Sequence, residues 1–244
     1  MTVRRRWGIR PIHEHTSPET GFWNAAVPSM CVVPLQQHVG SRLEPLVEAG
    51  DLVREGMVVA ESDRRLAIPL HAPIPGRVRE VGTVRLFDDT VSPAMSIELH
   101  GEFDRLGKQV EPTPWEAADR EELLQRIRAA GVVCGPRSAI PAHLYLGSTR
   151  PLGKPTILLD LAETEPYVTG GIEQAGAASE SVLTGVEIAA RITGAAEVHV
   201  AVATRFRGKL KTVVRSARRR GFSVHRVPYR YPGITGDEVR RLVA

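Results

Sequence analysis

Cysteine is scarce in this sequence, with Cys31 and Cys134 the only two among its 244 residues. Two thiols cannot form a disulfide framework, and their scarcity is typical of a reducing compartment. A cubane iron–sulfur cluster normally takes about four thiolates, so the chain cannot hold one unaided. A cysteine-rich zinc site is excluded for the same reason. We therefore expect neither an iron–sulfur cluster nor a metal site.

Lysine and long apolar runs are also rare. The basic residues are overwhelmingly arginine, and the formal charge is +4. The lysines are limited to Lys108, Lys154, Lys209 and Lys211. No apolar run approaches the roughly 18 residues that span a bilayer, and the basic start of the chain is not followed by the apolar segment of a secretory signal. We therefore expect a cytoplasmic protein.

The pattern of residue types along the sequence predicts an N-terminal arm and two domains. Residues 1–26 lack periodicity and are expected to form an extended arm. Residues 27–108 contain short β-branched runs broken by glycine and proline, which is typical of an all-β domain. Residues 109–244 alternate apolar strands with helical patterns and so predict a parallel, Rossmann-like α/β domain. The fold class is thus α/β plus all-β.

The second domain is expected to start with a helix. Thr113 and Glu116 have capping-box spacing, Pro114 falls at the favoured first helical position, and Gly131 ends the helix. Further strands are predicted over 156–161, 196–203 and 222–228, and further helices over 180–194 and 207–221.

The first domain has the turn pattern of a small barrel. Turns at Gly50-Asp51 and Gly56 flank short alternating strands, and the sequence APIPGRV closes the layer. This pattern resembles the barrel-sandwich hybrid of biotinyl and lipoyl carrier domains. In those domains the modified lysine lies on the hairpin at which this chain has Arg64 and Arg65. Arginine stays protonated and is not acylated, so we expect a structural barrel without carrier chemistry.

A longer match narrows the family. The segment VVPLQQHVGSRLEPLVEAGDLV resembles the start of the core of the RnfC protein of Rnf-type electron-transport complexes. The cobalamin reductases of propanediol microcompartments and the electron-transfer protein of proline reductase systems share this architecture. Matches continue in order with AGVVCGPRSAIPAHLYL, TILLDLAETEPYVTGG and YRYPGITGDEVRRLV. The family continues into further domains, including one with two cysteine-coordinated clusters, so the chain resembles a truncated, RnfC-like member.

The resemblance also implies a cofactor loop. The family is similar to the flavin subunit of respiratory complex I, in which a loop reading G-x-G-G-A-G-F-P-T cradles FMN and NADH. Its glycines let backbone N–H groups approach phosphate and ring closely. Aligned without gaps, the four glycines fall on Cys134, Pro136, Arg137 and Ala139. We therefore expect a degenerate flavin site and no bound cofactor, with FMN or NADH as the alternatives.

Several residues remain candidates for a function in this pocket. Cys134 is the candidate catalytic residue, because a thiolate near Arg137 would be reactive; the alternative is a buried, inert thiol. The glutamates of the downstream segment either accept hydrogen bonds from a ribose or nicotinamide or cap the next turn. The candidate cofactor-binding residues are Gly135, Arg137, Ser138, Glu163, Glu165 and Tyr167.

Together these patterns favour an accessory or structural subunit of an electron-transfer complex, which is not catalytic by itself and relies on other protein subunits. One alternative is an active oxidoreductase subunit whose altered pocket uses Cys134. Another is a non-redox module that binds an anionic partner through the basic run 205–220, although such a run is also typical of a solvated helix face. Phe206 is its only aromatic residue, so there is no strong case for nucleic acid. Membrane association is expected only through partners.

Overall fold

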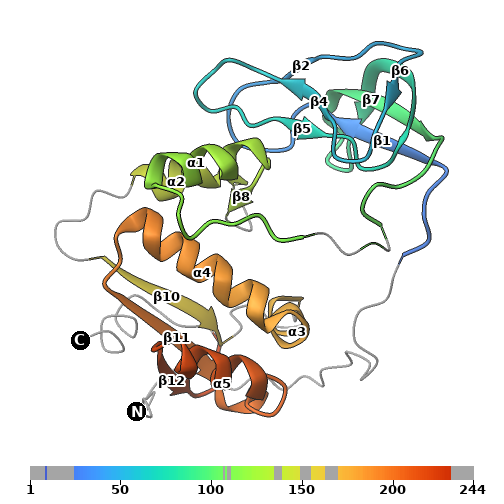
Figure 1. The fold of residues 1–244 in the computed structure, drawn as a ribbon. Coiled ribbons are helices and arrows are strands. Elements are labelled where there is room, and N and C mark those ends of the chain that lie inside the picture. The colour runs from blue at the N-terminus through green and yellow to red at the C-terminus, as the bar shows by residue number, and fades with distance from the viewer. Residues whose placement is uncertain are drawn as a thin grey trace. The chain divides into compact units, whose positions relative to one another are not determined.

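The computed structural model describes residue 9 and residues 25–106, 108, 111–134, 139–148, 155–162 and 170–231. Contacts divide the chain into two compact units (Figure 1). One unit is Ala25–Thr149, and the other combines Met1–Asn24 with Arg150–Ala244. Among the described helices, none combines the length and the apolar character needed to cross a bilayer.

The unit Ala25–Thr149 contains a barrel of short antiparallel strands. Its two sheets have the orders β1-β7-β6-β3 and β2-β4-β5. The predicted turns are confirmed, because Gly50 and Gly56 have φ of 102° and 78°, a conformation that favours glycine. The strands are β1 (Met30–Pro34), β2 (Glu44–Pro45), β3 (Leu52–Val53), β4 (Val58–Glu61), β5 (Leu70–His71), β6 (Gly76–Arg85) and β7 (Val91–Leu99).

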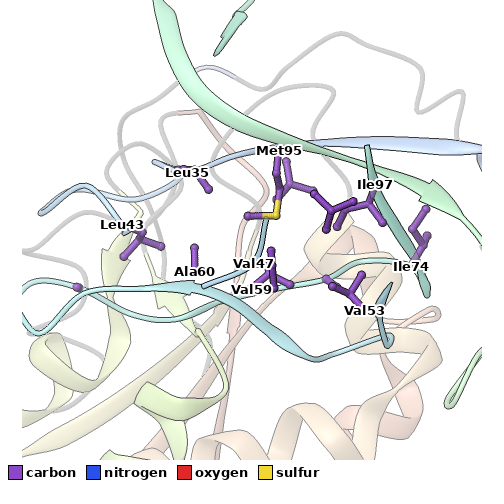
Figure 2. Close-up of a cluster of buried hydrophobic side chains, with 13 residues drawn as sticks. Leu35, Leu43, Val47, Val53, Val59, Ala60, Ile74, Met95 and Ile97 are labelled. Carbon is purple, nitrogen blue, oxygen red and sulfur yellow. The ribbon is translucent and has the colours of Figure 1, made fainter. Parts of the chain in front are cut away.

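Aliphatic side chains from both sheets fill the barrel. Alternation along β7 places Met95 and Ile97 inside, at 1% and 0% exposure. Gly76, at the start of β6, lies so close to β7 that a Cβ would collide with the carbonyl oxygen of Glu98. Figure 2 shows side chains from distant parts of the sequence converging on this core, among them Leu35, Leu43, Val53, Val59 and Ile74. The all-β domain predicted from the sequence is confirmed.

Two helices and a short hairpin follow the barrel in the same unit. They are α1 (Arg120–Ala129), β8 (Val133–Cys134), β9 (Ile140–Pro141) and α2 (Ala142–Ser148). They contact the barrel segment directly: the Val39 N–H donates to the Ala139 carbonyl at 3.3 Å. The first compact unit thus ends at residue 149, whereas the sequence predicted a domain boundary after residue 108.

The predicted start of the first helix is wrong. Asp119, and not Thr113, is the N-cap of α1, and its carboxylate accepts a hydrogen bond from the Glu122 N–H at 2.8 Å. Both positions are followed three residues later by glutamate, but only Asp119 directly precedes a regular helical repeat, with Leu123 and Leu124 buried. The predicted end is confirmed, because Gly131 follows the helix with φ of 67°.

The second unit is built on a parallel sheet of order β10-β11-β12. The strands are β10 (Thr156–Leu161), β11 (Glu197–Ala203) and β12 (Ser223–Val227), close to the predicted ranges. The helices are α3 (Gly170–Ala177), α4 (Ser179–Thr193) and α5 (Lys211–Arg219), with a 3₁₀ turn, η1 (Thr204–Phe206), between β11 and α5. The expected α/β domain is confirmed, although α3 was not expected and α5 is shorter than predicted.

Helices α4 and α5 pack on one face of this sheet (Figure 1). Leu183 of α4 and Val213 of α5 are fully buried against Val200 and Val202 of β11. Alternate residues of the strands, including Ala201 and Val227, are buried on the opposite face. The sheet therefore has an apolar side chain on each face of β11, as a parallel sheet requires.

Candidate functional site

Of the residues that the sequence assigned to a cofactor pocket, the structure describes only Cys134. The other candidates lie outside the described residues: Gly135, Arg137, Ser138, Glu163, Glu165 and Tyr167. Cys134 is at the end of β8, opposite Ile140 of β9. The structure thus describes the two ends of the altered loop.

Neither end of the loop offers a bare main chain. Cys134 and Ala139 stand where the resemblance places two of the cradle glycines, and each adds a Cβ to the backbone. Ala139 has φ of 39°, a left-handed conformation that glycine adopts readily and alanine rarely. These two positions do not fit a loop whose N–H groups approach a phosphate and a planar ring without side chains between them.

The thiol of Cys134 is not activated by its described surroundings. Its side chain is half-buried, and this burial raises the pKa of the Cys134 thiol above its usual range. A reactive cysteine needs the opposite shift, because the thiolate is the nucleophile. Its surroundings therefore favour a protonated thiol at neutral pH.

A cavity of about 780 Å³ lies beside α2. Leu66 of the barrel hairpin, Leu124 of α1 and Tyr145 of α2 are among its mainly apolar lining residues. His143 also lines it, and its buried Nδ1 has no hydrogen-bond partner within the described part of the chain. Burial and then the nearby Arg128 lower the pKa of His143. The neutral imidazole is the favoured form in this cavity.

The hairpin tip between β4 and β5 is exposed. Arg64 and Arg65 occupy it, and the Ala67 N–H donates to the Arg64 carbonyl at 2.9 Å to close the turn. The position at which a carrier domain presents its lysine is therefore formed here, but a guanidinium replaces the amine.

The second unit carries a strongly cationic groove, which we call the α5–β12 groove. It has a volume of about 670 Å³ and runs from the end of β11 along α5 to β12. Its floor is apolar, formed in part by Val202, Val214 and Val224. Among the described residues, its charged lining residues are all cations, namely Arg207, Lys211, Arg215, Arg218, Arg219 and Arg226. The sequence marked this run as basic but could not show which of its members share one surface.

Other cations of the same run are neutralised by acidic residues. Arg220 donates to Glu180 at 2.7 Å and also pairs with Glu187, so it fastens α5 to α4. Lys209 pairs with Glu173 of α3. The carboxylates of Glu173 and Glu187 are thereby paired with cations outside the α5–β12 groove, while Glu180 pairs with Arg220 and also lies near Arg219 of the groove through Ser216.

A buried histidine pair lies on the opposite side of the sheet from α5. His199 of β11 and His225 of β12 have nearly parallel rings, with centroids 5.0 Å apart, and His199 Nδ1 is 2.8 Å from His225 Nε2. His199 Nε2 is also 3.3 Å from a carboxylate oxygen of Glu197. Burial and then His199 lower the pKa of His225. Among the described residues, no group of three or more histidine, cysteine or acidic side chains is arranged to hold a metal ion.

Comparison with known proteins shows that the sequence is similar to one family. Residues 4–102 match the RnfC barrel sandwich hybrid domain. Over 232 residues the chain is 31% identical to the C subunit of an ion-translocating oxidoreductase complex of Rhodobacter capsulatus, covering 93% of this chain and 44% of that protein. It is 28% identical to the protein of the same name from Pseudomonas aeruginosa, covering 94% of this chain and 31% of that protein.

Two further comparisons involve a more distant relative and a solved structure. The C subunit of a proton-translocating ferredoxin:NAD(+) oxidoreductase complex of Clostridium ljungdahlii is 27% identical, covering 73% of this chain and 39% of that protein. Among solved structures, a chain of an NAD+-reducing [NiFe]-hydrogenase aligns with 46% of this chain and 21% of its own length, at a TM-score of 0.37 and 16% identity. That structural likeness is too low to define the fold.

The barrel and the parallel sheet thus define a protein with one all-β unit and one α/β unit. More narrowly, the chain belongs with the RnfC-like proteins, and its first unit contains an RnfC-type barrel sandwich hybrid domain. It spans less than half the length of the relatives described above.

Proposed function

We propose that this chain is an accessory or structural subunit of an ion-translocating oxidoreductase complex, held in place by contacts with other protein subunits. The observation that carries the proposal is the continuous similarity to an RnfC-like protein over 93% of the chain. Its barrel has the carrier-domain shape with arginine at the hairpin tip, so the domain supports assembly and not acyl or carboxyl transfer. The scarcity of cysteine supports a location facing the reducing cytoplasm.

We further propose that the chain binds no FMN or NADH of its own. Support comes from the side chains at Cys134 and Ala139 and from the strained φ of Ala139. The alternative of an active subunit requires a reactive Cys134, and the raised pKa of its thiol works against that role. Electron transfer would then depend on chromophores and clusters in the partner subunits.

Co-purification tests the proposal. The tagged chain is isolated from its native host under mild conditions, its partners are identified by mass spectrometry, and the absorbance of the complex and of the separated chain is recorded. We expect redox subunits to co-purify and the flavin absorbance to stay with them. A chain that elutes alone contradicts the assignment to a complex, whereas stoichiometric FMN on the separated chain contradicts the degenerate site.

A further inference from the structure

We propose that the α5–β12 groove is the docking site for an extended acidic segment of another polypeptide. Only the expected source of this segment, a partner subunit, rests on the proposed function. The groove combines a continuous set of cations, an apolar floor and a β-strand along one side. Each of these three features narrows the chemistry of the occupant.

Apart from Arg219, which donates to Ser216 beside Glu180, the groove cations are not neutralised within the described part of the chain. Arg207, Lys211, Arg215, Arg218 and Arg226 are exposed, and they form no ion pair with any described residue. On α5, Lys211 and Arg215 are four residues apart, as are Arg215 and Arg219. Like charges at this spacing destabilise a helix. An anionic occupant would relieve that repulsion and gain several charge-assisted hydrogen bonds.

The floor of the groove selects against purely charged occupants. Val202 is buried, while Val214 and Val224 are partly buried and pack against the core of the second unit. These side chains provide an apolar strip between the cations. No described aromatic side chain lines the groove, so this part of the chain does not offer the stacking surfaces typical of single-stranded nucleic acid sites. Its concave form also does not match a flat lipid surface.

The third feature is the strand itself. Among the described strands, β12 pairs with β11 alone. Recognition by strand addition uses backbone hydrogen bonds for affinity and side-chain pockets for specificity. A segment lying beside β12 can place carboxylates against Arg218 and Arg226 and aliphatic side chains against Val224. An extended acidic peptide with interspersed aliphatic residues therefore fits all three features.

The test uses the full chain and a fluorescently labelled peptide of alternating Glu and Val. Binding is measured by fluorescence anisotropy for the unaltered chain, for R215E/R218E and for R42E/R64E. The last variant is the matched control, since it reverses the same number of exposed arginines on the barrel. We expect R215E/R218E to weaken binding by on the order of tenfold, and R42E/R64E to change it by less than about twofold.

A second variant keeps the test valid if R215E/R218E fails to fold, as judged by circular dichroism. Arg226→Glu changes one exposed residue of β12 and is expected to weaken binding by about threefold. A peptide with Gln in place of Glu should bind distinctly less well. Single-stranded DNA and phosphatidylserine vesicles serve as competing probes. R215E/R218E should weaken the binding of either probe no more than it weakens the binding of the acidic peptide.

The docking proposal is overturned if the unaltered chain does not bind the Glu/Val peptide, if the barrel control weakens binding equally, or if only DNA or vesicles respond to R215E/R218E. These outcomes are separate from those of the co-purification. If the chain co-purifies with partners but does not bind the peptide, the proposed function still holds. Peptide binding by a chain that has no partners contradicts the proposed function and leaves the groove as a docking site.

Discussion

His225 shows how a single residue can link the second unit to pH. His225 is 8% exposed, its Nε2 lies 2.8 Å from His199 Nδ1, and its own Nδ1 has no hydrogen-bond partner among the described residues. Burial and the neighbouring His199 both lower the pKa of His225. The folded chain therefore takes up a proton at this ring less readily than the unfolded chain does. The cost that His225 adds to the folded state is therefore absent above the ordinary histidine pKa of about 6.5 and grows as the pH falls below it.

We expect the free energy of unfolding to fall as the pH drops from about 7 to about 5. One proton taken up only by the unfolded chain gives a slope of at most about 1.4 kcal/mol per pH unit. His225→Phe should reduce this slope, measured by urea denaturation at several pH values, even if it lowers stability throughout. His100→Phe, at an exposed position of the barrel, should leave the slope unchanged. Because the pKa of His143 is also lowered, part of the slope should persist.

At the scale of elements, helix caps decide where α1 begins. The sequence analysis predicted a cap at Thr113 with Glu116, whereas the structure places it at Asp119, which has the same spacing to Glu122. In the structure the Asp119 carboxylate satisfies an N–H of the first turn, while Thr113 lies outside the helix. Arg126 then donates to Glu122 at 2.6 Å, one turn further along. A residue pattern alone could not rank the two candidate caps, because the choice depends on which helix start lets Leu123 and Leu124 reach the core.

Asp119→Ala should lower the free energy of unfolding by about 1 kcal/mol, since it leaves an N–H of the first turn without its side-chain partner. Asp119→Asn should retain most of the stability, because an amide oxygen also accepts this hydrogen bond. Thr113→Ala is the matched control and should change stability by less than about 0.5 kcal/mol. Chemical denaturation followed by circular dichroism measures all three. A larger effect at Thr113 than at Asp119 would restore the earlier helix start.

Other elements were predictable to different degrees. The strands β10 and β11 are continuous apolar runs, and their ranges nearly match the prediction. Helix α3 was missed because its sequence GGIEQAGA is rich in glycine, which disfavours helix. The basic run was visible in the sequence. The sequence could not show, however, that Arg220 binds Glu180 while other cations of the run line the groove, because this depends on tertiary packing. That difference between the cations is what turns a charged helix into a candidate site.

At the scale of the whole molecule, the chain contains two separate hydrophobic cores. The barrel core includes Leu35, Val59 and Ile97, and the core of the second unit includes Leu183, Val200 and Leu210. Each set is drawn from one compact unit. A unit that buries its own core should fold without the other.

A fragment comprising residues 25–149 should therefore unfold cooperatively on its own. Ile97→Ala should destabilise this fragment by about 2–5 kcal/mol, as large-to-small changes in a packed core do, and should destabilise the barrel transition of the full chain by a similar amount. Val200→Ala in the full chain should leave the barrel transition in place. Thermal and urea unfolding measure these effects. A fragment without cooperative unfolding would show that the barrel depends on the rest of the chain.

The arginine on β12 has a further consequence for the purified protein at high concentration. A bare sheet margin is a template on which identical molecules can stack into insoluble material. Arg226 lies on β12, which pairs with β11 alone among the described strands, and the groove cations lie beside it. Two molecules that approach along this margin therefore repel each other. Dissolved ions screen this repulsion, whose range is about 8 Å at physiological ionic strength and about 3 Å at 1 M salt. Concentrated salt should therefore favour precipitation of a protein that stays dispersed in dilute buffer.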